Sequence, residues 1–176
     1  KETLEFDFGG IFLVEGQQLI PFAVVEKTSE KKVRRKSTNT HDGLIFSIDD
    51  GIVGLTVKMN QSIRVGNVHE YPAYREIFKG VNSQLSVPMK VDEHTIGVIS
   101  IESIKPDSFS ESDQQLLEVV AAQITIAIQN ARLIEQVLNE LKERTRAEEE
   151  LAAQSLKLED TVKERTEKFR LANEEL

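Results

Sequence analysis

The chain has 176 residues, of which 39% are hydrophobic and 30% charged, which suits one globular domain plus a further charged element. It contains no cysteine, which excludes disulfides, thiolate metal sites and a cysteine nucleophile within these residues. The net charge of −8 disfavours a nucleic-acid surface, because phosphate neutralisation needs clustered Lys and Arg.

The N-terminal part of the chain predicts a β-hairpin. Two apolar runs, 5–14 and 19–26, flank a turn at 15–18. Residues 27–40 are polar and carry six basic side chains, which we interpret as a solvated loop rather than a nucleic-acid site. No aromatic residue lies among these charges, so base stacking has no platform.

Short elements are expected next. A short helix begins after Asp49 and Asp50, since acidic residues suit a helix N-terminus, and this explains the two acids without a catalytic role. A short strand is predicted at 62–65. A second short helix is predicted at 72–78, with proline in its first turn.

A second hairpin is predicted from the apolar segments 84–91 and 95–104, joined at 92–94. The segment 95–104 has little polar face, which favours a central strand covered on both sides. Residues 110–113 then form a capping-box pattern. The apolar residues after it follow a helical spacing: Leu116, Leu117, Val120, Ile124 and Ile128.

The last 70 residues, from Asp107 on, contain neither Gly nor Pro, so one long helix can run through them. Residues 135–176 hold 12 acidic and 8 basic residues and a single aromatic, Phe169. We therefore expect two parts, a globular domain over 1–133 and a charged helix over 134–176. The longest uncharged apolar run, 119–131, is too short to span a bilayer, so no membrane segment is expected.

The order of these motifs resembles a GAF domain, the small-molecule sensing module of signalling proteins. The matching pieces are Gly51-Ile52-Val53-Gly54, Ser62-Ile63-Arg64-Val65, 83–88, Ile96-Gly97-Val98-Ile99, 109–113 and 127–133. The resemblance covers most of 4–134 and implies an α+β fold. It implies a central antiparallel sheet of about six strands, helices over one face and a small pocket at the other. Asn67-Val68 stands where the family usually has Asp-Val.

The C-terminal segment resembles the signalling helix that joins sensor domains to output domains. Leu141-Lys142-Glu143-Arg144-Thr145 is echoed 21 residues later, three heptads, by Val162-Lys163-Glu164-Arg165-Thr166. From Leu151 the apolar seam follows a 4-3 spacing that includes Leu158 and Val162, and the step from Glu148 to Leu151 is one residue short, a stammer. We expect a parallel homodimeric coiled coil with an adjustable joint near 145–155.

Seven residues would surround the pocket that the resemblance implies: Phe46, Ile48, Val65, His69, Tyr71, Tyr74 and Phe78. Several of them can equally be core residues. His41, His69 and His94 are spaced 28 and 25 residues apart, which matches no metal-ligand pattern, so no metal site is expected. Among the three, His69 is the best ligand candidate, and no cofactor can be named.

The function expected from this sequence is a non-catalytic sensor, the cytoplasmic input part of a sensor histidine kinase whose output domain follows residue 176. No nucleophile, base and orienting group occur together, so the chain is expected not to be an enzyme. Its partners would be an unidentified small molecule and a second copy of the chain, with no nucleic acid and no membrane. The alternatives are a dimerisation scaffold with a vestigial pocket, or the regulatory domain of a transcription factor or nucleotide cyclase.

Overall fold

A computed structural model describes residues 4–27, 33–36, 45–72 and 74–174, and it has the α+β fold expected from the sequence. In chain order its elements are β1 (Phe8–Glu15), β2 (Gln18–Lys27), β3 (Val33–Lys36), β4 (Phe46–Ser47), α1 (Gly51–Met59), β5 (Ile63–Val65), the 3-10 helix η2 (Val68–Glu70), β6 (Ser83–Val91), β7 (His94–Ser103) and α2 (Glu111–Glu174). The chain divides into two compact units, 1–128 and 129–176, called here the globular unit and the helical unit.

The strands form one antiparallel sheet in the order β3-β2-β1-β7-β6-β5, and β4 pairs with β2. Both predicted hairpins, β1-β2 and β6-β7, are present. Residues 97–103 of β7 are buried and lie between β1 and β6, which confirms the prediction of a central strand. The expected sheet of about six strands is confirmed.

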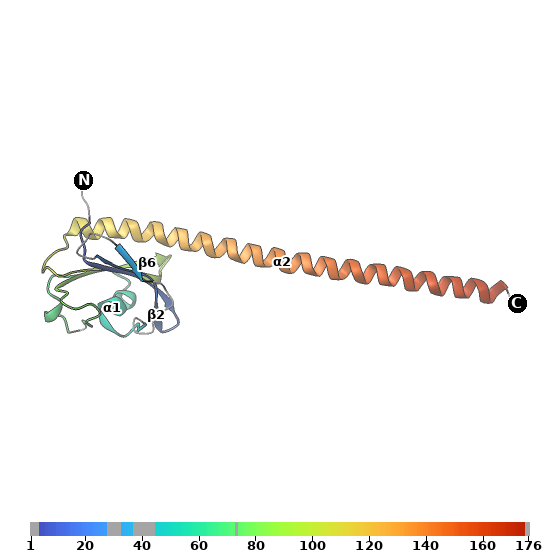
Figure 1. Ribbon diagram of the computed structural model, residues 1–176, viewed down its shortest axis with the longest axis horizontal. Coiled ribbons are helices and arrows are strands. Elements are labelled where there is room, and N and C mark those ends of the chain that lie inside the picture. The colour runs from blue at the N-terminus through green and yellow to red at the C-terminus, as the bar shows by residue number, and fades with distance from the viewer. Residues whose placement is uncertain (1–3, 28–32, 37–44, 73, 175–176) are drawn as a thin grey trace. The chain divides into compact units, whose positions relative to one another are not determined.

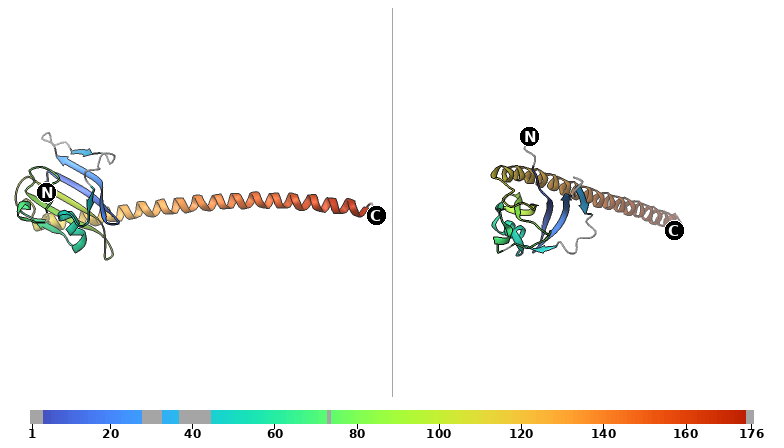
Figure 2. Two further views of the ribbon diagram at one scale, coloured as in Figure 1. Left: turned by 90° about the horizontal axis from the view of Figure 1, so that it is seen from below. Right: turned by 60° about the vertical axis from the view of Figure 1, so that its left-hand side comes forward.

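The sheet lies between α1 and the first turns of α2 (Figure 1 and the right-hand view of Figure 2). Side chains alternate between the faces of a strand, so each strand supplies both sides of the core. On one face, Leu85 and Met89 pack in the same cluster as Leu117 of α2. On the other face, Val98 packs with Val53 of α1.

The predicted capping box starts α2. Asp113 N–H donates to Ser110 Oγ over 3.2 Å, and Ser110 N–H donates to Asp113 Oδ2 over 2.7 Å. These reciprocal bonds satisfy two backbone donors that the helix leaves free. The helix then runs to Glu174, as the absence of Gly and Pro predicts.

Two predictions of local structure are wrong. Part of the supposed loop at 27–40 is β3, which pairs with β2 at the sheet edge, where basic residues are common; its neighbours 28–32 and 37–44 lie outside the described residues. No helix forms over the described residues of 72–78. Tyr71 is extended because it precedes Pro72, and this conformation ends η2.

In the helical unit, the apolar residues of α2 whose side chains the structure describes are exposed, among them Leu151, Leu158 and Val162. By length and composition, α2 contains an 18-residue window apolar enough to cross a membrane. Helices in the cores of globular domains also meet that criterion, so the expectation that the chain has no membrane segment stays a prediction.

Candidate functional site

A buried polar patch lies at the centre of the sheet, on the face that α1 covers. Gln84 and Ser86 of β6 stand directly opposite Glu102 and Ser100 of β7, and all four side chains are at most 3% exposed. Polar groups this deep in a sheet need hydrogen-bond partners. We call these four residues the polar floor.

Three members of the polar floor bond to one another. The Gln84 side-chain amide donates to Ser86 Oγ over 3.1 Å and to Ser100 Oγ over 2.9 Å. The two serine hydroxyls are 2.9 Å apart and share a further hydrogen bond. Glu102 is the floor residue that lies outside this network and lacks a hydrogen-bond partner for Oε2.

Glu102 Oε2 and the Tyr74 hydroxyl are the two fully buried side-chain polar atoms without a hydrogen-bond partner among the described residues. Burial raises the pKa of Glu102 from 4.5 to about 7. Burial, and then the charge of Glu102, raise the pKa of Tyr74 well above its ordinary value. The two groups are therefore close enough to interact, and each lacks a partner.

Tyr74 belongs to residues 71–78 without 73, called here the cap, in which Arg75 and Ile77 line a small cavity together with Gln84 of the floor. Phe78 of the cap stacks on Phe8 of β1 with ring centroids 4.5 Å apart. Arg75 bonds to Asp50 at the start of α1 over 3.2 Å, and its guanidinium lies 5.2 Å from the ring centroid of Phe46. The cap is thus held at its middle and at its C-terminal end, and its described residues form no regular helix.

Beneath the cap is a cavity of about 10 Å³, lined by Phe46, Asp50, Gly51, Ile52, Val53, Arg75, Ile77 and Gln84. Such a volume is at the lower limit for one water molecule. A ligand larger than water can enter this space only if part of its lining moves.

Of the sequence-predicted pocket residues, Phe46 lines this cavity, and most of the others belong to two apolar clusters next to α1. Phe46 and Ile48 pack in one apolar cluster. Val65, Tyr71, Tyr74 and Phe78 belong to a second cluster with Ile52 and Phe8. His69 is exposed, and its ring meets that of Tyr74 edge-on at 6.3 Å. Their role in ligand binding stays a prediction.

Sequence reasoning missed the polar floor itself. The signal was present as polar residues at alternate positions, Gln84 and Ser86 in one strand and Ser100 and Glu102 in the next. In a strand with one solvated face such residues face water. Here the strands are central, so the same alternation places them against α1.

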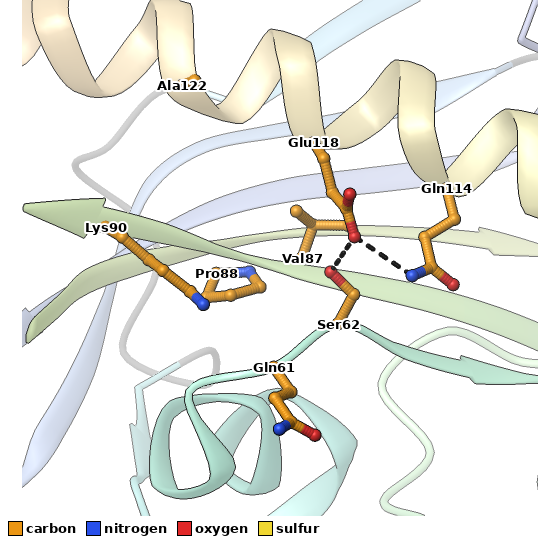
Figure 3. A pocket seen from close by; sticks show the side chains of 8 residues that line it. All are labelled: Gln61, Ser62, Val87, Pro88, Lys90, Gln114, Glu118 and Ala122. Carbon is orange, nitrogen blue, oxygen red and sulfur yellow. Dashed lines mark hydrogen bonds between the residues drawn. The ribbon is translucent and has the colours of Figure 1, made fainter. Parts of the chain in front are cut away.

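A larger groove lies elsewhere on the globular unit (Figure 3). It measures about 510 Å³ and is lined by Gln61, Ser62, Val87, Pro88, Lys90, Gln114, Glu118 and Ala122. Glu118 Oε1 accepts hydrogen bonds from Ser62 Oγ over 2.6 Å and from Gln114 Nε2 over 3.0 Å, and the three side chains point toward one another in Figure 3. Because these groups satisfy one another at an open surface, the groove is the weaker candidate.

Metal ligation has no support in the described residues, which contain no cluster of three or more His, Asp or Glu side chains able to hold an ion. The acids at the start of α1 have structural partners: Asp49 pairs with Lys58, whose hydrogen bond and charge lower the pKa of Asp49, and Asp50 pairs with Arg75.

Comparison with known proteins identifies the family of this fold. Residues 1–129 match the family model described as GAF domain. The anaerobic nitric oxide reductase transcription regulator NorR of Enterobacter sp. (strain 638) is 24% identical over 149 residues, covering 78% of this chain and 27% of the relative. The chain thus spans about a quarter of the length of the curated relatives it matches.

Solved structures support the fold. A type II free methionine-R-sulfoxide reductase from Thermoplasma acidophilum is 24% identical with a TM-score of 0.60, covering 71% of this chain and 80% of its own. The GAF domain of an Acinetobacter phosphoenolpyruvate-protein phosphotransferase is 20% identical with a TM-score of 0.59, covering 74% and 75%.

These structures correct one prediction. The expectation that the chain is not an enzyme is wrong, because several solved structures with this fold are enzymes, free methionine-R-sulfoxide reductases. The expectation rested on finding no nucleophile, base and orienting group together in the sequence. The fold instead accommodates catalysis as well as sensing.

Proposed function

The chain belongs to the GAF domain family, and we propose that its globular unit senses a small molecule on behalf of a larger signalling protein. The ligand binds on the polar floor under the cap, and the response leaves the domain through α2. Most of the pocket residues expected from the sequence then serve as its apolar walls.

The observation that carries this proposal is the pair of buried, unpartnered atoms, Glu102 Oε2 and the Tyr74 hydroxyl. A buried polar group without a partner costs about 1–3 kcal/mol. Such a cost is accepted at functional sites, where a ligand supplies the missing bond. Pockets for small molecules typically combine apolar walls with a few polar groups of this kind.

The strands that carry the floor also touch α2. Gln84 and Ser86 face α1, whereas their neighbours Leu85 and Val87 pack in the cluster that contains Leu117 and Ala121 of α2. A ligand that displaces the floor therefore moves side chains against the first turns of α2. We propose that ligand binding is relayed to α2 through these contacts between β6 and the first turns of α2.

The helical unit completes the proposal as a parallel homodimeric coiled coil. Its exposed Leu151, Leu158 and Val162 need cover, and a second copy in register supplies it. Parallel pairing presents both globular units to the same output, with the joint near 145–155 as the adjustable part.

For the whole protein we propose a cytoplasmic sensor histidine kinase. A transcription regulator is the second candidate, because curated relatives of this chain are regulators of that class. The sequence of the full-length gene separates the two.

A ligand screen tests the sensor proposal against a scaffold with a vestigial pocket. We expect a metabolite panel, followed by NMR on the full chain, to yield a compound that shifts resonances of Gln84 and Tyr74. Gln84→Leu should abolish this binding, whereas the matched change Gln114→Leu in the surface groove should preserve it. Binding that survives Gln84→Leu unchanged, or a panel that never perturbs the floor, would contradict the proposal.

A further inference from the structure

We infer that the ligand of this site is a small organic cation whose N–H groups donate hydrogen bonds to Glu102 and Tyr74, an inference that rests on the proposed ligand site. The rest of the floor is already satisfied, because Gln84, Ser86 and Ser100 bond to one another. The demand for new partners is therefore concentrated at the two unpartnered atoms.

Above about pH 7, where Glu102 is ionised, the chemistry of those atoms selects donors over acceptors. An ionised carboxylate only accepts hydrogen bonds, and a phenol oxygen accepts as well as donates. An anionic ligand would bring a second negative charge beside Glu102 in a buried setting, where like charges repel strongly. A cation with several N–H groups meets both atoms and offsets the cost of burying the carboxylate.

No basic side chain among the described residues meets this demand from within. Arg75 is half exposed and is engaged with Asp50 and the face of Phe46. His69 is exposed and contacts the ring of Tyr74. Burial is the single cause that acts on the pKa of Glu102, so no neighbouring positive charge lowers it.

The walls suit an organic cation better than a metal ion. Phe8 stands opposite Glu102 in the β1-β7 register, Phe78 stacks on Phe8, and Tyr74 belongs to the same cluster. Aromatic rings attract ammonium and guanidinium groups and accommodate an attached alkyl chain. Hard metal ions instead need several oxygen ligands, and the described residues hold no cluster of three or more carboxylate or imidazole groups.

The test uses three probes of similar size on the full chain: n-butylammonium, 1-butanol and butyrate. NMR titration of the Tyr74 and Glu102 resonances at millimolar probe measures the affinity of each. We expect n-butylammonium to bind most tightly and to release protons near pH 7, because the cation lowers the pKa of Glu102 from about 7.

Variants then assign the contacts. Glu102→Gln keeps the shape but removes the charge, and we expect it to weaken n-butylammonium binding by at least about tenfold and to abolish proton release. Tyr74→Phe should weaken binding about fivefold. Glu118→Gln, the matched change in the surface groove, should leave the affinity unchanged. A folded spectrum for each variant confirms that loss of binding is not loss of structure.

The outcomes separate this inference from the ligand site itself. Tighter binding of butyrate or 1-butanol at the floor overturns the cationic class and leaves the site standing. Equal affinity in Glu102→Gln and the parent chain also overturns the class. If none of the three probes perturbs the floor, the inference fails, and the metabolite panel decides separately on the site.

Discussion

The two units of this chain place similar apolar residues in opposite surroundings. Leu85 in the globular unit is 0% exposed, whereas Leu158 in the helical unit is 66% exposed. The globular unit buries its apolar side chains on both faces of one sheet, so it contains its own core. In the helical unit, the described apolar residues are exposed and contribute little to stability until something covers them.

What holds the helical unit together within one copy is local. Its ion pairs include Arg144–Glu148 at 3.0 Å, Arg146–Glu150 at 3.2 Å and Arg170–Glu167 at 2.8 Å. Exposed pairs of this kind contribute about 0.3–0.5 kcal/mol each and weaken in salt. The comparison teaches that the globular unit is specified by its own packing, whereas the helical unit, on our proposal, is specified by a second copy of the chain.

The largest expected effect is in cysteine crosslinking, which tests whether a second copy of the chain pairs with the helical unit. The chain contains no cysteine, so single cysteines report on one position only. In a parallel seam, Leu158→Cys and Val162→Cys should each form nearly complete disulfide-linked dimers under mild oxidation, because identical positions face each other. Glu167→Cys points away from the seam and should form few. Similar yields at all three positions on a denaturing gel, or none at the first two, would reject this parallel register.

The next effect breaks the core of the globular unit. Leu85→Ala should lower the free energy of unfolding by about 2–5 kcal/mol, because it opens a cavity in a packed cluster. Both tyrosines, Tyr71 and Tyr74, lie in this unit, so tyrosine fluorescence during urea unfolding follows it selectively. Leu158→Ala is the matched change in the helical unit and should leave this transition in place. A shift of equal size from both changes would show that the units do not differ as described.

The free energy of unfolding, measured by the same tyrosine fluorescence as a function of pH, examines Glu102 of the polar floor. The pKa of Glu102 is about 7 in the folded chain and 4.5 as its ordinary value, so between these pH values the folded state holds a proton that the unfolded state has lost. Glu102 therefore contributes stability below about pH 4.5 that is lost as pH rises through 7. The loss is on the order of 3 kcal/mol.

Glu102→Gln removes this titration. We expect the free energy of unfolding of the variant to fall less steeply than that of the parent chain between pH 5 and 8, and Glu118→Gln serves as the exposed control. Parallel pH profiles for the parent chain and Glu102→Gln would mean that the carboxylate has a partner that keeps it ionised.

Much of the fold follows from local patterns. The reciprocal side chains of Ser110 and Asp113, the two hairpins and the long run without Gly or Pro are features of neighbouring residues, and each predicts its element. The missing helix at 72–78 is a local effect as well, since Pro72 imposes extended backbone on Tyr71. The prediction instead took Pro72 as the proline of a first helical turn.

The site depends on distant pairing, which a single sequence does not specify. Ser100 and Glu102 form a buried polar site only because β7 is central and the register sets them opposite Ser86 and Gln84. The one predicted pocket residue with an unpartnered atom, Tyr74, was chosen from the family resemblance. Burial without a partner is a property of the packed structure, and composition or spacing does not reveal it.

The smallest effect concerns the start of α2, which the globular unit fixes. Ser110→Ala removes the acceptor for Asp113 N–H and should lower the free energy of unfolding by about 1 kcal/mol. Ser112→Ala, two residues further on, removes no described hydrogen bond and should change the free energy of unfolding little. Because the capped turn lies in the globular unit, tyrosine fluorescence should report the loss, while cysteine crosslinking at Leu158→Cys should continue in the Ser110→Ala background. If Ser110→Ala lowered the stability of the globular unit and also abolished crosslinking, the seam would depend on the capping box of α2. The two units would then be coupled more tightly than their separate packing implies.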